Sequence, residues 1–179
     1  MLSPATVKGP QPCHCYQELT DKFFVHLDSV ENRTLYRTRE IESLLKDKTF
    51  VLEKPTVFYI HGYVEYVTDK SVGTVVSAYI RRGGYNVLAL DWANLAFGNY
   101  FNVGDEAGRA LVKLLKAGLQ RQGLHIVGHS MGVQVGAVAA RHLAAEGYTV
   151  ERLTGLDPAY PGFYPPILTK PISPKDARF

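Results

Sequence analysis

Short apolar runs alternate along this chain with longer stretches whose apolar residues recur at helical spacing. The apolar runs cover residues 22–27, 56–60, 86–90, 124–127 and 152–156. They are rich in β-branched, aromatic and aliphatic residues, and runs that are apolar on both faces are typical of parallel strands buried under helices. We therefore predict five strands.

The stretches between these runs predict three helices, at residues 67–82, 105–121 and 130–146. Gly83 and Gly147 stand where the first and third would end, as glycine often does. The second has one apolar stripe and begins with Asp105 and Glu106, so we expect both acids in its first turn, where the helix dipole favours them. Strands and helices that alternate through short connections predict a doubly wound, mostly parallel α/β sheet.

The two ends of the chain differ in composition. Residues 1–20 are rich in proline and polar residues, and we interpret them as a loose leader. Residues 21–179 are then one domain or part of one, as expected for 179 residues. No apolar stretch typical of a signal peptide is visible at the start.

Composition excludes some functions. Hydrophobic residues make up 46% of the chain and charged residues 21%, which is ordinary for a globular protein. The net charge is only +3 and the lysines and arginines are scattered, so we expect no nucleic-acid partner. No apolar run approaches the roughly 20 residues of a membrane span, so we predict no transmembrane segment.

Two short patterns near the start leave alternatives open. Cys13 and Cys15 are separated by one residue, so a disulfide between them would be strained. They could be free thiols, could bind a metal with His14 although no second ligand pair follows, or could pair with cysteines outside this sequence. The triplet from Asn32 to Thr34 fits a glycosylation sequon and gives weak support for secretion.

Chemistry-bearing residues follow four of the predicted strands. They are His61-Gly62, Asp91-Trp92, His129-Ser130 and Asp157-Pro158. Ligand sites in doubly wound sheets lie at the carboxyl ends of the strands. The sequence therefore predicts a site at this edge.

Residues 128–132, Gly-His-Ser-Met-Gly, match the G-x-S-x-G pattern. The pattern places a serine on a sharp strand-to-helix turn, where side chains two residues before and two after it would clash. The alternative is a glycine-rich turn with an incidental serine. Because a strand pattern precedes it and a helix pattern follows, we predict that Ser130 is a nucleophile.

An acyl-transfer serine needs oxyanion donors and an acid. The N–H after the nucleophile, at Met131, is one expected donor, and the loop after an earlier strand supplies the other, which we assign to Tyr63. Asp157 follows the serine by one strand and would orient a histidine. The alternatives are a plain turn at His61-Gly62 and an Asp-Pro that only opens a turn.

The segments FYIHGY, NVLALDWA, HIVGHSMGVQVGAVAAR and LTGLDPAYPGF are similar, in order and spacing, to the pancreatic lipase family. The family includes triacylglycerol lipases and phospholipases A1. The resemblance covers residues from about 20 to the end. It implies a secreted, extracellular α/β-hydrolase that acts on lipid esters at an interface, with Ser130 as nucleophile, Asp157 as acid, and Tyr63 and Met131 as oxyanion donors.

The chain departs from the family in three respects. The catalytic histidine of the family lies beyond the aspartate, but all six histidines here precede Asp157. Mammalian pancreatic members bind calcium through acids and an arginine in the region of residues 165–176, where only Asp176 matches, so we expect no metal and no cofactor. We expect neither the lid nor a C-terminal lipid-binding domain of the family within these residues, which leaves substrate and colipase open.

The missing base leaves two hypotheses. His129 should point away from the serine hydroxyl, His61 is expected to be structural, and His125 lies inside a core strand. Loss of a triad histidine costs about a millionfold in turnover, so these 179 residues alone should be nearly inert. We expect a truncated part of a larger secreted lipase. The alternative is a non-catalytic relative that binds lipid or stores amino acids, as yolk proteins do.

Overall fold

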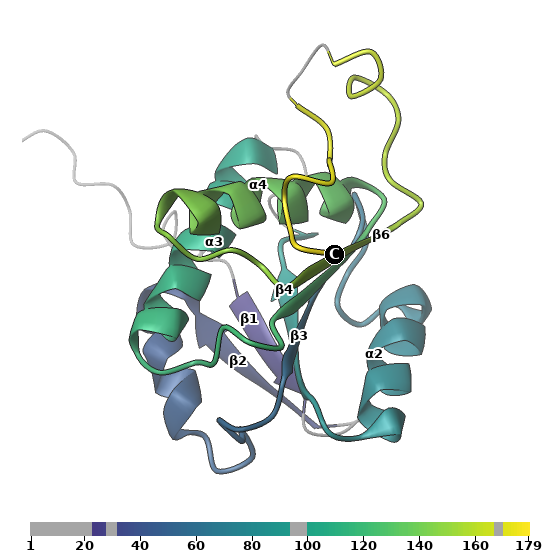
Figure 1. Cartoon of the computed structure of the whole chain (residues 1–179). Helices are drawn as coiled ribbons and strands as arrows, with labels where there is room; N and C mark the ends of the chain where they lie inside the picture. Colours follow the sequence, from purple (N-terminus) through teal and green to yellow (C-terminus); the bar gives the residue numbers. More distant parts are fainter. Residues whose placement is uncertain (1–22, 28–31, 94–99, 167–169) are drawn as a thin grey trace, which may run out of the picture.

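Six strands form one sheet, with helices on both of its faces (Figure 1). The computed structural model describes residues 23–27, 32–93, 100–166 and 170–179. The elements in chain order are β1 (Phe23–Leu27), β2 (Arg33–Arg37), the 3-10 helix η1 (Thr38–Lys46), β3 (Thr56–Ile60), α2 (Lys70–Arg82), β4 (Asn86–Asp91), α3 (Tyr100–Lys116), β5 (His125–His129), α4 (Met131–Ala145) and β6 (Arg152–Leu156). The predicted leader, residues 1–20, lies outside the described residues.

The sheet has the order β2-β1-β4-β3-β5-β6. Strands β4, β3, β5 and β6 are parallel, whereas β1 is antiparallel to both β2 and β4. The five predicted strands are confirmed with ends shifted by no more than two residues. Strand β2 and helix η1 were not predicted, because β2 has no apolar run: its middle residue, Leu35, is 54% exposed at the edge of the sheet.

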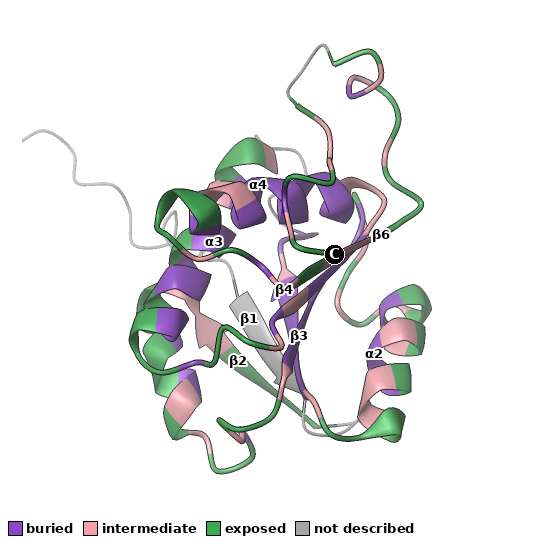
Figure 2. Cartoon of the chain, in the orientation of Figure 1, coloured by how far each residue is buried: buried purple, intermediate pink, exposed green. Residues whose placement is uncertain are grey.

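Side chains of the central strands point alternately to the two faces of the sheet and pack into two separate hydrophobic cores. Val57 and Tyr59 of β3 face α2, together with Val127 of β5. Phe58 and Ile60 of β3 face the larger core, which α3, α4 and η1 cover. Figure 2 shows burial concentrated in the central strands and on the helix faces turned toward them. Burial on both faces explains why these strands are apolar throughout.

Helix α3 starts at Tyr100, five residues earlier than predicted, and two of its glycines serve packing. A Cβ added at Gly104 would lie 2.6 Å from Val138 Cβ, and one added at Gly108 would lie 2.6 Å from His142 Cβ. The glycines therefore allow α3 and α4 to cross closely. The expectation that Asp105 and Glu106 lie in the first turn is wrong, since the first turn of α3 contains no acid.

Helix α3 also ends earlier than predicted, at Lys116 rather than residue 121. Gly118 has a φ of 120°. The Leu119 N–H bonds the Leu114 carbonyl at 2.8 Å and the Gly118 N–H bonds the Leu115 carbonyl at 3.2 Å. This pair of bonds is the Schellman ending of a helix. It turns Leu119 back into the core, where only 4% of it is exposed.

Residues 170–179 return to the sheet beside β6 (Figure 1). The Phe179 N–H bonds the Glu151 carbonyl at 3.1 Å, and the Leu153 N–H bonds the Phe179 carbonyl at 2.9 Å. This is parallel pairing. The segment after β6 therefore leaves the carboxyl edge of the sheet and comes back at its opposite end.

Candidate active site

Three of the predicted site segments follow neighbouring strands at the carboxyl edge of the sheet. Ile60 of β3 pairs with Gly128 of β5, and His129 of β5 pairs with Leu156 of β6. The next residues along the chain are His61, Ser130 and Asp157. Parallel register therefore delivers all three to the same edge.

Backbone hydrogen bonds join Ser130 to residues on either side of Asp157, namely Leu156 and Ala159. The Ser130 N–H donates to the Leu156 carbonyl at 2.9 Å, and the Ala159 N–H donates to the Ser130 carbonyl at 3.2 Å. Asp157 is exposed and has a φ of 46°. The structure thus brings Asp157 beside the turn that carries Ser130.

Ser130 occupies the sharp turn that the G-x-S-x-G pattern requires. Its φ is 51° and its ψ is −120°, a region that side chains rarely adopt. A Cβ on Gly132 would lie 2.2 Å from the Ile60 carbonyl oxygen, and one on Gly128 would lie 2.6 Å from the Gly132 carbonyl oxygen. The predicted need for glycine on both sides of the serine is confirmed.

The loop after β3 starts from His61, which is completely buried. Its Nδ1 lies 2.9 Å from the Gly62 carbonyl and must donate, while its Nε2 accepts from the Trp92 N–H at 3.4 Å. Burial lowers the pKa of His61, although the Gly62 carbonyl and nearby carboxylates act in the opposite direction. His61 is therefore a neutral structural residue, as expected.

The Gly62–Tyr63 peptide has a defined direction. The Gly62 carbonyl accepts from His61 Nδ1 and, at 3.4 Å, from the Glu65 N–H. The peptide is trans, so the Tyr63 N–H points away from that carbonyl. Tyr63 is 46% exposed and Met131, at the start of α4, is partly buried.

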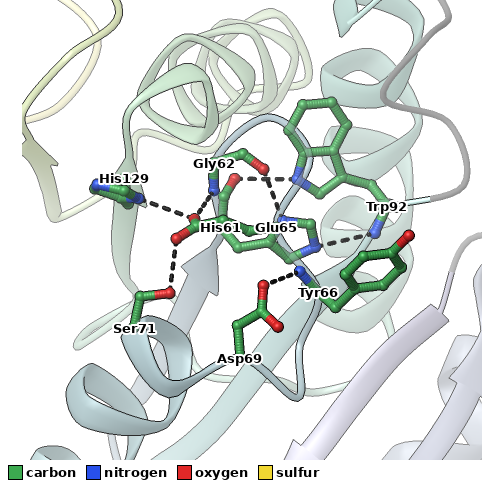
Figure 3. A network of polar contacts seen from close by, with 8 residues as sticks. All are labelled: His61, Gly62, Glu65, Tyr66, Asp69, Ser71, Trp92 and His129. Carbon is green, nitrogen blue, oxygen red and sulfur yellow. Dashed lines mark hydrogen bonds and ion pairs between the residues drawn. The ribbon is translucent and has the colours of Figure 1, made fainter.

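Sequence reasoning missed Glu65, which organises this edge (Figure 3). Its carboxylate accepts from the Gly62 N–H and from Ser71 Oγ, and it lies 2.9 Å from His129 Nδ1. Burial acts to raise the pKa of Glu65, but the hydrogen bonds from Ser71, His129 and Gly62 lower it on balance. An acid three residues after His-Gly, together with a histidine in the elbow, was the available signal.

The other histidines with described side chains have ring contacts with groups other than the serine hydroxyl. His129 Nδ1 lies 2.9 Å from Glu65 Oε2. His125 Nε2 lies 2.8 Å from Thr154 Oγ1, and His142 Nδ1 lies 2.7 Å from Asp105 Oδ1. Burial lowers the pKa of His125 to about 4, with Arg152 adding to the effect.

A family model described as Lipase matches residues 10–179. The chain belongs to the lipase family. It is 30% identical to phospholipase A1 member A of Rattus norvegicus over 78% of this chain and 32% of that protein. It is 29% identical to pancreatic triacylglycerol lipase of Sus scrofa over 76% of this chain and 32% of that protein. The chain spans about a third of the length of these curated relatives.

A further relative and one solved structure extend this comparison. Pancreatic lipase-related protein 2 of Sus scrofa is 30% identical and matches all of this chain and 44% of that protein. The hyperthermophilic esterase from Pyrobaculum calidifontis matches 55% of this chain and 35% of its own, at 20% identity and a TM-score of 0.43. The sheet, the turn at Ser130 and the family membership together make the fold that of an α/β-hydrolase.

The segment that holds calcium in mammalian members of the family does not fit a calcium site here. Asp176 is bound by Arg141 through two bonds of 2.9 Å and accepts the Ser173 N–H at 2.8 Å. Arg141 also donates to the carbonyls of Lys170 and Pro171. Within the described residues, no group of three or more histidine, cysteine or acidic side chains could hold a metal. The arginine supplies the positive charge in this segment.

A helix that crosses a membrane needs about 20 predominantly apolar residues. Among the described residues, no helix is both long enough and apolar enough to span a bilayer.

Proposed function

We propose that the protein hydrolyses carboxylic esters of lipids through an acyl-enzyme on Ser130. The observation that carries the proposal is the backbone of Ser130, which is held at a φ of 51° between two glycines with no room for a side chain. Such strain persists where the surrounding structure enforces it, and it exposes a serine for attack. Membership of the lipase family and the names of the relatives support the substrate class.

The proposed reaction has two halves. Ser130 Oγ attacks the ester carbonyl carbon while its proton passes to a histidine base, and the carbonyl oxygen becomes an oxyanion that the Tyr63 and Met131 N–H groups receive. The oxyanion collapses, the alcohol leaves with the proton, and water then hydrolyses the acyl-serine by the reverse sequence. Asp157 would orient the histidine and stabilise its charged form. Loss of one oxyanion donor typically costs about 3–4 kcal/mol of transition-state stabilisation.

The histidine base is the part of the reaction that these residues do not supply. The order Ser, Asp, His would put it after Asp157, and the six histidines of this sequence precede Asp157. The described ring contacts of His61, His125, His129 and His142 lead to other groups. The activity test therefore uses the native protein as its source makes it.

We propose triacylglycerol or phospholipid at an interface as the substrate, and an extracellular location. The relatives carry the names of both a phospholipase A1 and a triacylglycerol lipase. Exposed apolar side chains near the site, Tyr63 and Tyr66 among them, suit a lipid partner rather than a polar one.

The test is labelling of the native protein with a fluorophosphonate probe, followed by peptide mapping. We expect one labelled residue, Ser130, and fatty-acid release from triacylglycerol emulsions or phosphatidylcholine vesicles. Ser130→Ala should abolish both. Ser43 is a matched control, since it is exposed and bonds a backbone carbonyl in η1: Ser43→Ala should label like the wild type.

Two outcomes would contradict this proposal. Native protein in which Ser130 remains unlabelled would overturn the acyl-enzyme. Vesicle binding that survives Ser130→Ala, with no fatty-acid release by the wild type, would instead favour the lipid-binding or storage alternative.

A further inference from the structure

One carboxylate, that of Glu65, joins three elements at the carboxyl edge of the sheet (Figure 3). Oε1 accepts from Ser71 Oγ at 2.7 Å, in the first turn of α2. Oε2 accepts the Gly62 N–H of the loop after β3 and lies 2.9 Å from His129 Nδ1 at the end of β5. The side chain is only 18% exposed.

Two of these partners each precede a proposed reacting group. Gly62 precedes Tyr63, whose N–H is a proposed oxyanion donor, and His129 precedes Ser130. The two segments touch: a Cβ on Gly62 would lie 2.8 Å from Glu65 Oε2, 3.2 Å from His129 Nδ1 and 3.2 Å from Ser130 Cβ. A shift of the loop would therefore be transmitted directly to the turn of the nucleophile.

Glu65 also fixes the direction of the oxyanion donor. Its carboxylate holds the Gly62 N–H, and its own N–H lies 3.4 Å from the Gly62 carbonyl, which His61 Nδ1 holds from the other side. With both polar groups of Gly62 held, the following trans peptide has little freedom to rotate. A displacement of about 1 Å at such a donor can reduce a rate about 100-fold.

We propose that Glu65 is a positioning residue, which couples the oxyanion loop to the nucleophile turn through Gly62, Ser71 and His129. The inference rests on the proposed function, because it gives Glu65 its purpose in the same reaction. Glu65 need not touch the substrate; it acts through the residues before Tyr63 and Ser130.

The network is suited to a carboxylate more than to a neutral polar side chain. The carboxylate accepts at both oxygens, and hydrogen bonds to an ionised group are stronger than those between neutral groups. A glutamine has one acceptor oxygen and an NH2 that can only donate. In Glu65→Gln the amide oxygen can accept at only one of the two positions, so either the Gly62 N–H loses its acceptor or Ser71 Oγ must reverse its role and accept from the NH2, and the negative charge is lost in both cases. Glu65→Ala loses all three contacts.

The first test is the rate of fluorophosphonate labelling at Ser130 in the native protein, at a temperature where every variant is folded. We expect Glu65→Ala to lower the limiting labelling rate about 10- to 100-fold, with the half-saturating probe concentration unchanged, and Glu65→Gln to lie between. A purely structural role would not lower the limiting labelling rate while leaving the half-saturating probe concentration unchanged.

Asp69→Ala is the matched control. Asp69 holds the Tyr66 N–H at 3.0 Å in the same loop, and no described bond joins its side chain to the turn of Ser130. We expect it to label at the wild-type rate. Equal labelling of Glu65→Ala and wild type would overturn the inference and leave the proposed function intact.

The second test does not depend on catalysis. Hydrogen exchange should speed up at the Gly62 and Glu65 amides in Glu65→Ala, while amides of β3 and α4 stay protected. Unchanged exchange at Gly62 would overturn the inference. Wild-type protein that is unreactive at Ser130 would overturn the proposed function, and exchange would still decide whether Glu65 holds the loop.

Discussion

At the scale of single residues, glycines in this molecule differ in how much room surrounds them. Gly132 lies under the carbonyls of Ile60 and His61, so a side chain there would meet backbone atoms that cannot rotate away. Gly73 lies inside α2, and an added Cβ would meet no atom within 4 Å. The first glycine is required by close approach, whereas the second only lowers helix propensity.

This contrast gives a paired prediction. Gly132→Ala should lower the free energy of unfolding by about 3 kcal/mol or more, since overpacking against backbone cannot be relieved by a rotamer change. Gly73→Ala should raise it by up to about 1 kcal/mol. Urea unfolding followed by the fluorescence of Trp92, the single tryptophan, measures both. A Gly132→Ala protein as stable as Gly73→Ala would contradict the steric argument.

At the scale of elements, α4 organises the segment after β6. Arg141 on α4 binds the Asp176 carboxylate and the carbonyls of Lys170 and Pro171. The Asp176 side chain is 3% exposed, so removal of its partner would leave a buried charge uncompensated. One guanidinium thus anchors the stretch of chain that returns to the sheet.

We predict that Arg141→Met lowers the free energy of unfolding by about 3–5 kcal/mol. Because Arg141 already neutralises Asp176, neither calcium nor a chelator should change the melting temperature of the wild type. Thermal melts with calcium and with EDTA test this. A calcium-dependent rise in the wild-type melting temperature would show that the segment does bind the ion.

At the same scale, some elements could be predicted from the sequence and others could not. The central strands were predictable because burial on both faces makes them apolar throughout, and α4 was predictable because a strand pattern and a glycine stop bracket it. The start of α3 was not, since Gly104 looks like a helix breaker until Val138 of another element is known to face it. Glu65 was missed for the same reason: His129, its partner, is 64 residues away.

At the scale of the whole molecule, the lowered pKa values of several groups all make the folded protein less stable as the pH falls. Burial lowers the pKa values of His61 and His125, so the folded protein resists protonating them. Hydrogen bonds outweigh burial and lower the pKa values of Glu65 and Asp105. Below about pH 6.5 the unfolded chain binds protons at histidine that the folded protein does not, and the carboxylates add to this at lower pH. Stability should therefore fall on acidification.

His125 offers a test of that balance. Because its pKa is about 4 in the folded protein, the stability that depends on its neutral form is lost between about pH 6.5 and 4. The groups that face it are Arg152, Tyr79 and Thr154. Each proton bound only by the unfolded chain costs about 1.4 kcal/mol of stability per pH unit. In urea titrations, His125→Gln should lose less stability than wild type between pH 6.5 and 4.5. Parallel losses in the two proteins would contradict this account.

The buried amide of Gln134 has a practical consequence. Its NH2 donates to the Ala159 carbonyl at 3.1 Å and its oxygen accepts the Ile172 N–H at 3.0 Å, so Ala159 and Ile172 are held by one side chain. Between them, Phe163 is completely buried and packs against Tyr100. Doubling the length of a closed loop costs only about 0.6 kcal/mol. A guest peptide inserted between these two anchors, with Phe163 and the bonds from Arg141 to Lys170 and Pro171 kept, would start and finish at the same side chain. The α/β body could then serve as a scaffold for new recognition loops without redesign of its sheet.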